Sequence, residues 1–182
     1  MQVADIWRKK SRKALLSAFD WLQTLIFALV TITLLLAFAV RVVGVVGDSM
    51  LPTLESGDRL LLSGTKGEYA RGDIVVVDRY TDEPLIKRVV AVAGDVVQIT
   101  DDYHLLVNSI PQVEPYITGI TVPRDMVGPM QVPAGCVFVL GDNRTYSKDS
   151  RQREIGMVDV KDIVGKVVYR LWPLGKTGSV YE

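Results

Sequence analysis

The sequence has very little of the side-chain chemistry that metal sites and structural disulfides need. Among its 182 residues it has one cysteine, Cys136, and one histidine, His104. A single cysteine excludes an intrachain disulfide and a cysteine-based metal cluster, and a single histidine excludes a multi-histidine metal site. Cys136 begins the apolar run 136–140, where we interpret it as a small buried hydrophobic residue. The composition therefore gives no sign of metal chemistry.

The chain also lacks a net charge, because 21 basic residues balance 21 acidic ones. This balance gives no electrostatic reason to expect nucleic acid as a partner. The charges are unevenly placed, however, and the first 21 residues carry a basic cluster. Its members are Arg8, Lys9, Lys10, Arg12 and Lys13.

Residues 22–40 form a stretch of 19 residues without a charge. As a helix it would span roughly 28 Å, close to the ~30 Å hydrocarbon thickness of a bilayer. Because basic residues favour the cytoplasmic side, we predict a cytoplasmic segment over 1–21, a transmembrane helix over 22–40 and an extracytoplasmic domain over 41–182. The small residues Ala37 and Ala39 leave a second interpretation open, a signal peptide cleaved after Ala39. The length of the apolar stretch favours an uncleaved anchor.

From residue 41 onward the pattern changes to short β-branched runs separated by turn residues. The runs are 74–77, 85–92, 96–99, 104–107, 137–140 and 164–171. The segment 109–133 contains five prolines and is expected to be irregular. No sequence repeat and no long helical period is present after residue 41. We therefore predict one mainly β domain built of antiparallel strands.

The stretch 47–54, Gly-Asp-Ser-Met-Leu-Pro-Thr-Leu, places Ser49 between a flexible glycine and a rigid proline. Such a turn holds a hydroxyl in one exposed orientation, so Ser49 is either a surface-turn residue or a nucleophile. A serine nucleophile needs a base. His104 lies at a predicted hairpin, which favours a solvated turn histidine. The hydrolase motif G-x-S-x-G also fails, because Leu51 stands at its second glycine position.

Lys87 remains as the residue that can take the proton of Ser49. A free lysine, with a pKa of ~10.4, is protonated at neutral pH, but burial lowers that pKa by several units. On a strand, Lys87 shares one face with Leu85, Val89 and Ala91, an apolar setting that favours a lowered pKa. The alternative interpretation is an edge-strand lysine that extends its charge into water.

The chain resembles the bacterial type I signal peptidases in four motifs that follow one another at the family's spacing. They are 47–54, 71–75, 87–89 with Gly94-Asp95, and 141–151. Together with the anchor, the resemblance extends from the N-terminus to about Gly156. It implies a mainly β, barrel-like catalytic domain after one transmembrane helix, with no metal and no organic cofactor.

The resemblance also implies an activity, the removal of signal peptides from exported preproteins by a serine endopeptidase with a Ser/Lys dyad. Ser49 would be the nucleophile and Lys87 the general base. Ser147 would orient the Lys87 ammonium, and Asp142 would pair with Arg88. The remaining supporting residues, which would hold the motif around the dyad, are Asp149 and Arg151.

The family's substrate pockets correspond to five apolar positions of this chain. They are Val43, Val45, Met50, Leu54 and Ile86. Their bulk would admit small side chains at the −1 and −3 positions of an extended substrate that pairs with the chain as an added strand. Gly47 stands where some members carry a hydroxyl residue, so the Ser49 backbone N–H would stabilise the oxyanion with a second donor.

The resemblance implies two partners, preproteins with signal peptides and the lipid bilayer, at the outer face of a bacterial plasma membrane. Two alternatives stay open: a processing peptidase dedicated to one class of substrate, and a membrane-tethered peptide-binding domain without catalysis. A LexA-like self-cleaving regulator shares the Ser/Lys chemistry but would carry a DNA-binding domain, and the sequence has none.

Overall fold

The computed structural model describes residues 17–33, 40–64, 67–78 and 83–181. It divides the chain into two units, Met1–Ala39 and Val40–Glu182. Residues 17–33 are helical, and their apolar side chains, such as Leu25 and Leu29, are exposed. Within the described part of the chain, no helix has both the length and the apolar character that crossing a membrane requires. Residues 34–39, part of the predicted membrane segment and of the predicted cleavage site, lie outside the described residues.

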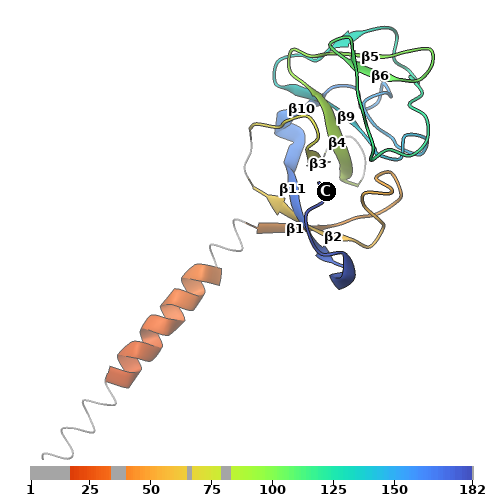
Figure 1. Ribbon diagram of the computed structural model, residues 1–182. Coiled ribbons are helices and arrows are strands. Elements are labelled where there is room, and N and C mark those ends of the chain that lie inside the picture. Colours follow the sequence, from red (N-terminus) through yellow and green to blue (C-terminus); the bar gives the residue numbers. More distant parts are fainter. Residues whose placement is uncertain (1–16, 34–39, 65–66, 79–82, 182) are drawn as a thin grey trace, which may run out of the picture. The chain divides into compact units, whose positions relative to one another are not determined.

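The second unit consists of two antiparallel sheets, so the prediction of a mainly antiparallel β domain is confirmed (Figure 1). The larger sheet has the order β1 (Val40–Gly44), β2 (Arg59–Ser63), β11 (Ile163–Trp172), β3 (Ile74–Val77), β4 (Leu85–Val92), β9 (Cys136–Leu140) and β10 (Val158–Asp159). The smaller sheet has the order β7 (Ile110–Pro111), β6 (Leu105–Val107), β5 (Val96–Ile99) and β8 (Met130–Gln131). Two short 3-10 helices, Val160–Asp162 and Leu174–Lys176, flank β11.

The β-branched runs predicted most of these strands, with small shifts at their ends. The run 164–171 extends to Ile163–Trp172, and 104–107 begins one residue later, at Leu105. The sequence analysis missed β1 and β2, and also the two-residue strands β7, β8 and β10. The leucine-rich segment Arg59–Ser63 has a weak local preference for strand, and it becomes one because it pairs with β1 on one side and β11 on the other. Tertiary pairing therefore decided this element.

The strand β4 lies between β3 and β9 in the larger sheet. Its register places Lys87 opposite Val75, and Arg88 between Ile74 and Leu140. Both cationic residues of β4, Lys87 and Arg88, are buried, as are all four residues of the neighbouring strand β3. The edge-strand interpretation of Lys87 is therefore wrong, because the lysine lies on an interior strand.

Three clusters of buried apolar side chains fill the domain. The first joins the stretch 47–54 to the larger sheet, because Met50 and Leu54 pack with Leu60, Ile74 and Ile86. The second lies around Val75, Val139 and Ile163. The third lies beneath the smaller sheet and is built around Phe138 and Leu140. The serine turn is therefore anchored in the main core and is not a loose surface loop.

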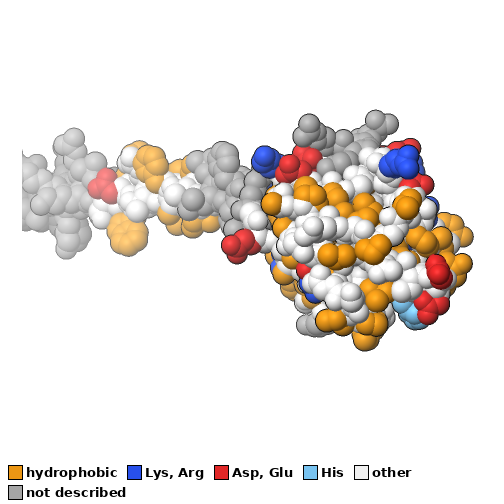
Figure 2. Space-filling view, turned by 90° about the horizontal axis from the view of Figure 1, so that it is seen from above, with side chains coloured by type: hydrophobic (Ala, Val, Ile, Leu, Met, Phe, Trp, Pro, Cys, Tyr) orange, Lys and Arg blue, Asp and Glu red, His pale blue; other side chains and the backbone are white. Residues whose placement is uncertain are grey.

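The loops of the smaller sheet keep apolar side chains on the surface, among them Ile110, Val113 and Val127. Figure 2 shows apolar side chains spread over one face of the domain. The His104 side chain is 70% exposed and lies 3.7 Å from the Asp102 carboxylate. The structure thus agrees with the interpretation of His104 as a solvated turn residue.

Truncation of Phe138 to alanine is expected to destabilise the domain strongly. The side chain is fully buried in the third cluster, so its removal leaves a cavity and costs about 3–5 kcal/mol. Denaturant unfolding of the full chain measures this change. The control Val127→Ala removes apolar atoms from a side chain that is 86% exposed, and we expect a change within about 0.5 kcal/mol. Equal destabilisation by both variants would contradict the assigned core.

Candidate active site

The serine turn is held by backbone hydrogen bonds and by two apolar anchors. Leu54 N donates to Met50 O at 2.9 Å, and Leu51 N donates to Asp48 O at 3.3 Å. Gly47 has a φ of +83°, a left-handed conformation that glycine adopts without strain. Because Met50 is buried in the core, the half-buried Ser49 beside it keeps a defined orientation.

Lys87 reaches Ser49 directly. Its Nζ lies 2.7 Å from Ser49 Oγ and 2.9 Å from Ile86 O. The lysine is 2% exposed, and this burial lowers its pKa to about 8, although the carboxylates of Asp149 and Asp142 act in the opposite direction. The two residues that the sequence paired across 38 positions are therefore in hydrogen-bond contact. With a pKa of about 8, about a tenth of Lys87 is neutral at pH 7, far more than for a lysine in water.

Gly141 lies between Ser147 and the backbone of Ser49. A Cβ on Gly141 would overlap the Ser147 hydroxyl and lie only 2.5 Å from Ser49 O, so only glycine fits there. Ser147 Oγ is buried and makes no hydrogen bond to Lys87, but it lies close enough to the Asp149 carboxylate to help lower the pKa of that group. The predicted hydrogen bond from Lys87 to Ser147 is therefore not formed in this structure, and the orienting role of Ser147 stays a prediction.

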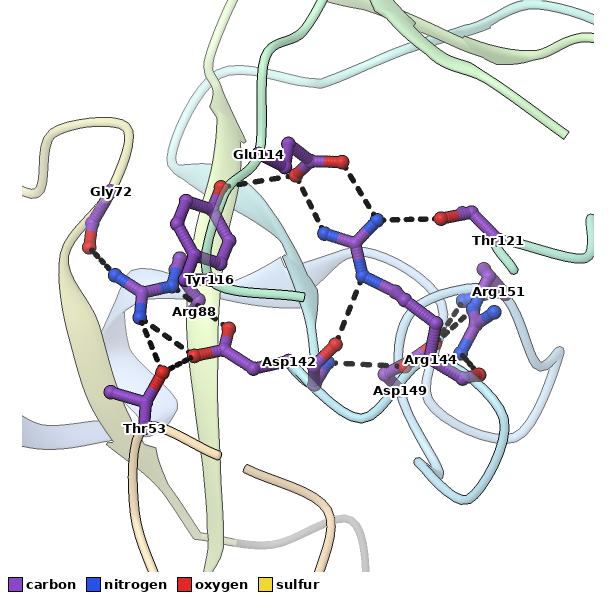
Figure 3. A network of polar contacts seen from close by, with 11 residues as sticks. Thr53, Gly72, Arg88, Glu114, Tyr116, Thr121, Asp142, Arg144, Asp149 and Arg151 are labelled. Carbon is purple, nitrogen blue, oxygen red and sulfur yellow. Dashed lines mark hydrogen bonds and ion pairs between the residues drawn. The ribbon is translucent and has the colours of Figure 1, made fainter. Parts of the chain in front are cut away.

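Arg88 and Asp142 form the ion pair that the sequence predicted (Figure 3). Arg88 donates through Nε and Nη2 to the two carboxylate oxygens of Asp142, at 2.9 and 2.7 Å. The hydroxyl of Thr53 donates to the same carboxylate at 2.5 Å. The pair therefore connects β4, which carries Lys87, to the stretch 47–54, which carries Ser49.

Asp149 and Arg151 form a second buried pair, with neither side chain exposed. Arg151 donates to both carboxylate oxygens at 2.8 Å, and it also donates to Arg144 O. Burial alone would raise the pKa of the Asp149 carboxyl, but the hydrogen bonds and charge of Arg151 outweigh it and hold that pKa below its usual value. Asp149 accepts a hydrogen bond from Gly141 N as well, and so supports the glycine that faces Ser49.

The sequence analysis missed several residues that hold the motif 141–151 in place. Asn143 donates from its side chain to Asp48 O at 3.1 Å and from its backbone to Ser49 O at 3.0 Å. Arg144 is buried and pairs with Glu114 through two hydrogen bonds of 2.6 and 2.8 Å. The segment around Glu114 had been predicted only as irregular, because its prolines hide any period. The signal for it was Arg144 itself. The two carboxylates of its motif, Asp142 and Asp149, pair with Arg88 and Arg151, so Arg144 needs a partner from outside the motif.

A groove of about 450 Å³ lies beside the dyad. It is lined by Val43, Gly44, Val45, Val46, Ser49, Met50, Glu83, Pro84, Leu85, Ile86 and Lys87. Four of the five predicted pocket residues thus line the groove. Leu54 does not, because the backbone turn directs its side chain into the core, where it is fully buried. The assignment of Leu54 to substrate contact is therefore corrected to a core role.

This arrangement combines the parts that acyl transfer through a serine requires. A hydroxyl lies in contact with a buried amine of lowered pKa, and an open groove leads to both. The described residues contain no group of three or more metal-ligating side chains.

Replacement of Arg151 by methionine is expected to destabilise the fold by about 3–5 kcal/mol, because it leaves the Asp149 carboxylate buried without a partner. Denaturant unfolding at neutral pH measures the loss. The loss should shrink as pH falls from neutral, because without Arg151 burial raises the pKa of the Asp149 carboxyl, which then becomes protonated in the folded variant.

The matched control is Lys176→Met, which breaks the exposed pair between Lys176 and Glu55. We expect no measurable change, because water screens a surface pair. If the two variants behave alike, the buried pair has no special structural role.

Comparison with known proteins places this site in a family. Residues 18–172 match the family described as "Signal peptidase, peptidase S26". A signal peptidase I from Bacillus licheniformis is 37% identical over 92% of this chain and 96% of that protein. A signal peptidase I from Bacillus caldolyticus is 41% identical over 70% of this chain and 76% of that protein.

A crystal structure of a signal peptidase I from Enterococcus faecalis is 25% identical, with a TM-score of 0.46 over 56% of this chain and 98% of that one. The family match covers most of the chain, and the two Bacillus relatives are identical to it at more than a third of the aligned positions. The chain therefore belongs to the signal peptidase family, peptidase S26, as a serine hydrolase of the bacterial type I class.

Proposed function

We propose that this chain is a membrane-anchored endopeptidase that cleaves N-terminal signal peptides from exported preproteins with a Ser49/Lys87 dyad. The observation that carries the proposal is the 2.7 Å contact between Lys87 Nζ and Ser49 Oγ, with the lysine buried and its pKa lowered. A neutral amine at this position accepts the hydroxyl proton of Ser49 as the oxygen attacks a carbonyl carbon. Family membership supports the substrate class.

The proposed reaction proceeds through an acyl-enzyme. Ser49 Oγ bonds to the scissile carbonyl carbon while Lys87 takes the proton, and the Ser49 backbone N–H donates to the oxyanion. Lys87 then gives its proton to the leaving amine as the peptide C–N bond breaks. Water, deprotonated by Lys87, hydrolyses the ester and restores Ser49.

The supporting residues keep the electrostatics of Lys87 balanced. Arg88 neutralises Asp142 and Arg151 neutralises Asp149, so neither carboxylate holds Lys87 in its charged form on its own. Ser147 is proposed to accept a hydrogen bond from the Lys87 ammonium once the proton has been transferred. Support for this role is that Ser147 packs against Gly141, which itself lies against the Ser49 backbone.

Cleavage after small residues at −1 and −3 follows from the lining of the groove. An extended substrate paired beside β1 presents alternate side chains to the same wall. Val43, Val45, Met50 and Ile86 make the proposed wall apolar, and their bulk is proposed to limit the space next to Ser49. Alanine-sized side chains therefore fit, while larger ones meet the buried core.

The proposed anchor is the helix over 22–40, with a cytoplasmic N-terminus and the catalytic domain at the outer face of the plasma membrane. Its support is the charge-free stretch after a basic cluster, together with the exposed apolar side chains of the helical residues 17–33. A lipid bilayer covers such side chains in the way that a protein core does.

Cleavage of a purified preprotein in detergent tests the dyad. Ser49→Ala is expected to have no activity above background, and Lys87→Ala to lose about 100- to 10,000-fold in kcat, because the attack loses its general base. The mature N-terminus, determined by sequencing, should follow small residues at −1 and −3. The control Lys161→Ala changes an exposed lysine outside the site and should retain wild-type activity.

Full activity of Lys87→Ala would remove the proposed base. Cleavage by no variant, wild type included, would favour the two alternatives: a peptidase dedicated to one substrate class, or a peptide-binding domain.

The pH dependence of kcat/KM provides a separate test. Because the neutral amine of Lys87 is the base and its pKa is about 8, kcat/KM should rise about tenfold per pH unit below 8 and level off above it. The substrate should carry no titratable residues near the scissile bond, so that its own ionisation does not contribute. A flat profile from pH 6 to 9 would contradict a lysine base.

A further inference from the structure

A short segment, residues 114–121, crosses the motif 141–151 and is called here the strap. Its backbone joins the motif by two hydrogen bonds, from Thr118 N to Asp142 O and from Arg144 N to Thr118 O, both at 2.9 Å. They form an isolated parallel bridge between Thr118 and Asn143. The strap therefore fixes the backbone on both sides of Asn143, the residue that hydrogen-bonds to the Ser49 turn.

A buried salt bridge holds one end of the strap. Glu114 accepts two hydrogen bonds from Arg144, whose guanidinium also donates to Thr121 Oγ1 at 2.7 Å and to Gly141 O at 3.0 Å. The Arg144 side chain is fully buried and that of Glu114 is 6% exposed. Arg144 thus connects both ends of the strap to the glycine that packs against Ser49.

The aromatic ring of Tyr116 lies between the strap and the ion pair of Arg88 with Asp142 (Figure 3). The guanidinium carbon of Arg88 is 4.0 Å from the centre of the ring, a cation–π contact. The Tyr116 hydroxyl donates to Glu114 Oε1 at 3.0 Å, which fixes the plane of the ring. A cavity of about 320 Å³ next to the ring is lined by Thr53, Arg88, Pro115, Tyr116, Val180 and Tyr181.

This ion pair connects the two halves of the dyad. Arg88 follows Lys87 on β4, and Asp142 holds Thr53, four residues after Ser49. Its two side chains are 6% and 0% exposed, so water does not weaken their attraction. Arg88 already lines this cavity beside the ring, so loss of the ring would widen the cavity over the guanidinium and admit more water to the pair.

We propose that Tyr116 is a positioning residue of the peptidase reaction, which keeps the ion pair of Arg88 and Asp142 dry and thereby holds Ser49 and Lys87 in contact. The inference rests on the proposed function, since it concerns the geometry of that dyad. No strap residue lines the substrate groove, so Tyr116 acts on the chemical step and not on substrate binding.

The test compares steady-state kinetics of the full-length wild type, Tyr116→Ala and Tyr116→Phe on one preprotein. We expect kcat of Tyr116→Ala to fall about tenfold or more, with KM within about twofold, because a loosened dyad affects the transition state alone. Tyr116→Phe keeps the ring over Arg88 and should stay within about threefold of wild type. Where Tyr116→Ala does not fold, Tyr116→Leu takes its place, because it keeps bulk but has no π face.

Two controls separate this role from a merely structural one. Val113→Ala changes an adjacent side chain that is 91% exposed, and its kcat should match the wild type. Arg88→Lys removes the planar guanidinium. In this background, Tyr116→Ala should lower kcat by less than about threefold further, because both changes act through one contact.

Three results would overturn the proposal: an unchanged kcat in Tyr116→Ala, an equal loss in Tyr116→Phe, or fully multiplicative losses in the Arg88→Lys background. Each would leave the dyad itself intact if Ser49→Ala remains inactive. Activity of Ser49→Ala would instead remove the proposed function, and the two failures are thus distinguishable.

Discussion

The burial of one lysine within a sheet is the constraint on which the rest of this structure depends. Lys87 loses hydration on an interior strand, and its pKa falls to about 8 because the charged form is disfavoured there. Two carboxylates, Asp142 and Asp149, oppose that effect. Each is paired with a buried arginine, Arg88 or Arg151, so the cluster around the lysine is close to neutral. Without these arginines, the two carboxylates would raise the pKa of Lys87 further. A lysine that stays protonated cannot accept the proton of Ser49.

A buried cluster of this kind is costly to form and has to be held by many hydrogen bonds. The motif 141–151 accordingly has few free polar groups among the described residues. Asp149 supports Gly141, Asn143 bonds to the turn of Ser49, and Arg144 bonds to the strap. The larger sheet provides the rigid frame, and the loops between its strands complete the site. Many hydrogen bonds therefore hold the surroundings of the buried Lys87, whereas its contact with Ser49 is a single hydrogen bond.

Support also comes from parts of the chain far from the sequence motifs. The strap reaches the site from the loops beyond the smaller sheet, and the segment after β11 contributes Val180 to the core beneath Leu54. Arg170, near the end of β11, donates to the carbonyl of Thr53. The position of Ser49 thus depends on three separate segments that pack around one turn. The contact between Ser49 and Lys87 is in this sense a product of the whole domain.

Local sequence predicted the strands that are rich in β-branched residues and the serine turn, because each depends on short-range pattern. Motif spacing singled out Ser49 and Lys87, which the structure brings into contact. The pairing of Arg88 with Asp142 was also readable, since each lies in a motif. Only the tertiary structure decided that Arg59–Ser63 is a strand, that Leu54 belongs to the core, and that Tyr116 and Glu114 reach the site. These outcomes depend on which distant segments meet. Burial and long-range pairing act between residues whose separation along the chain leaves no local trace.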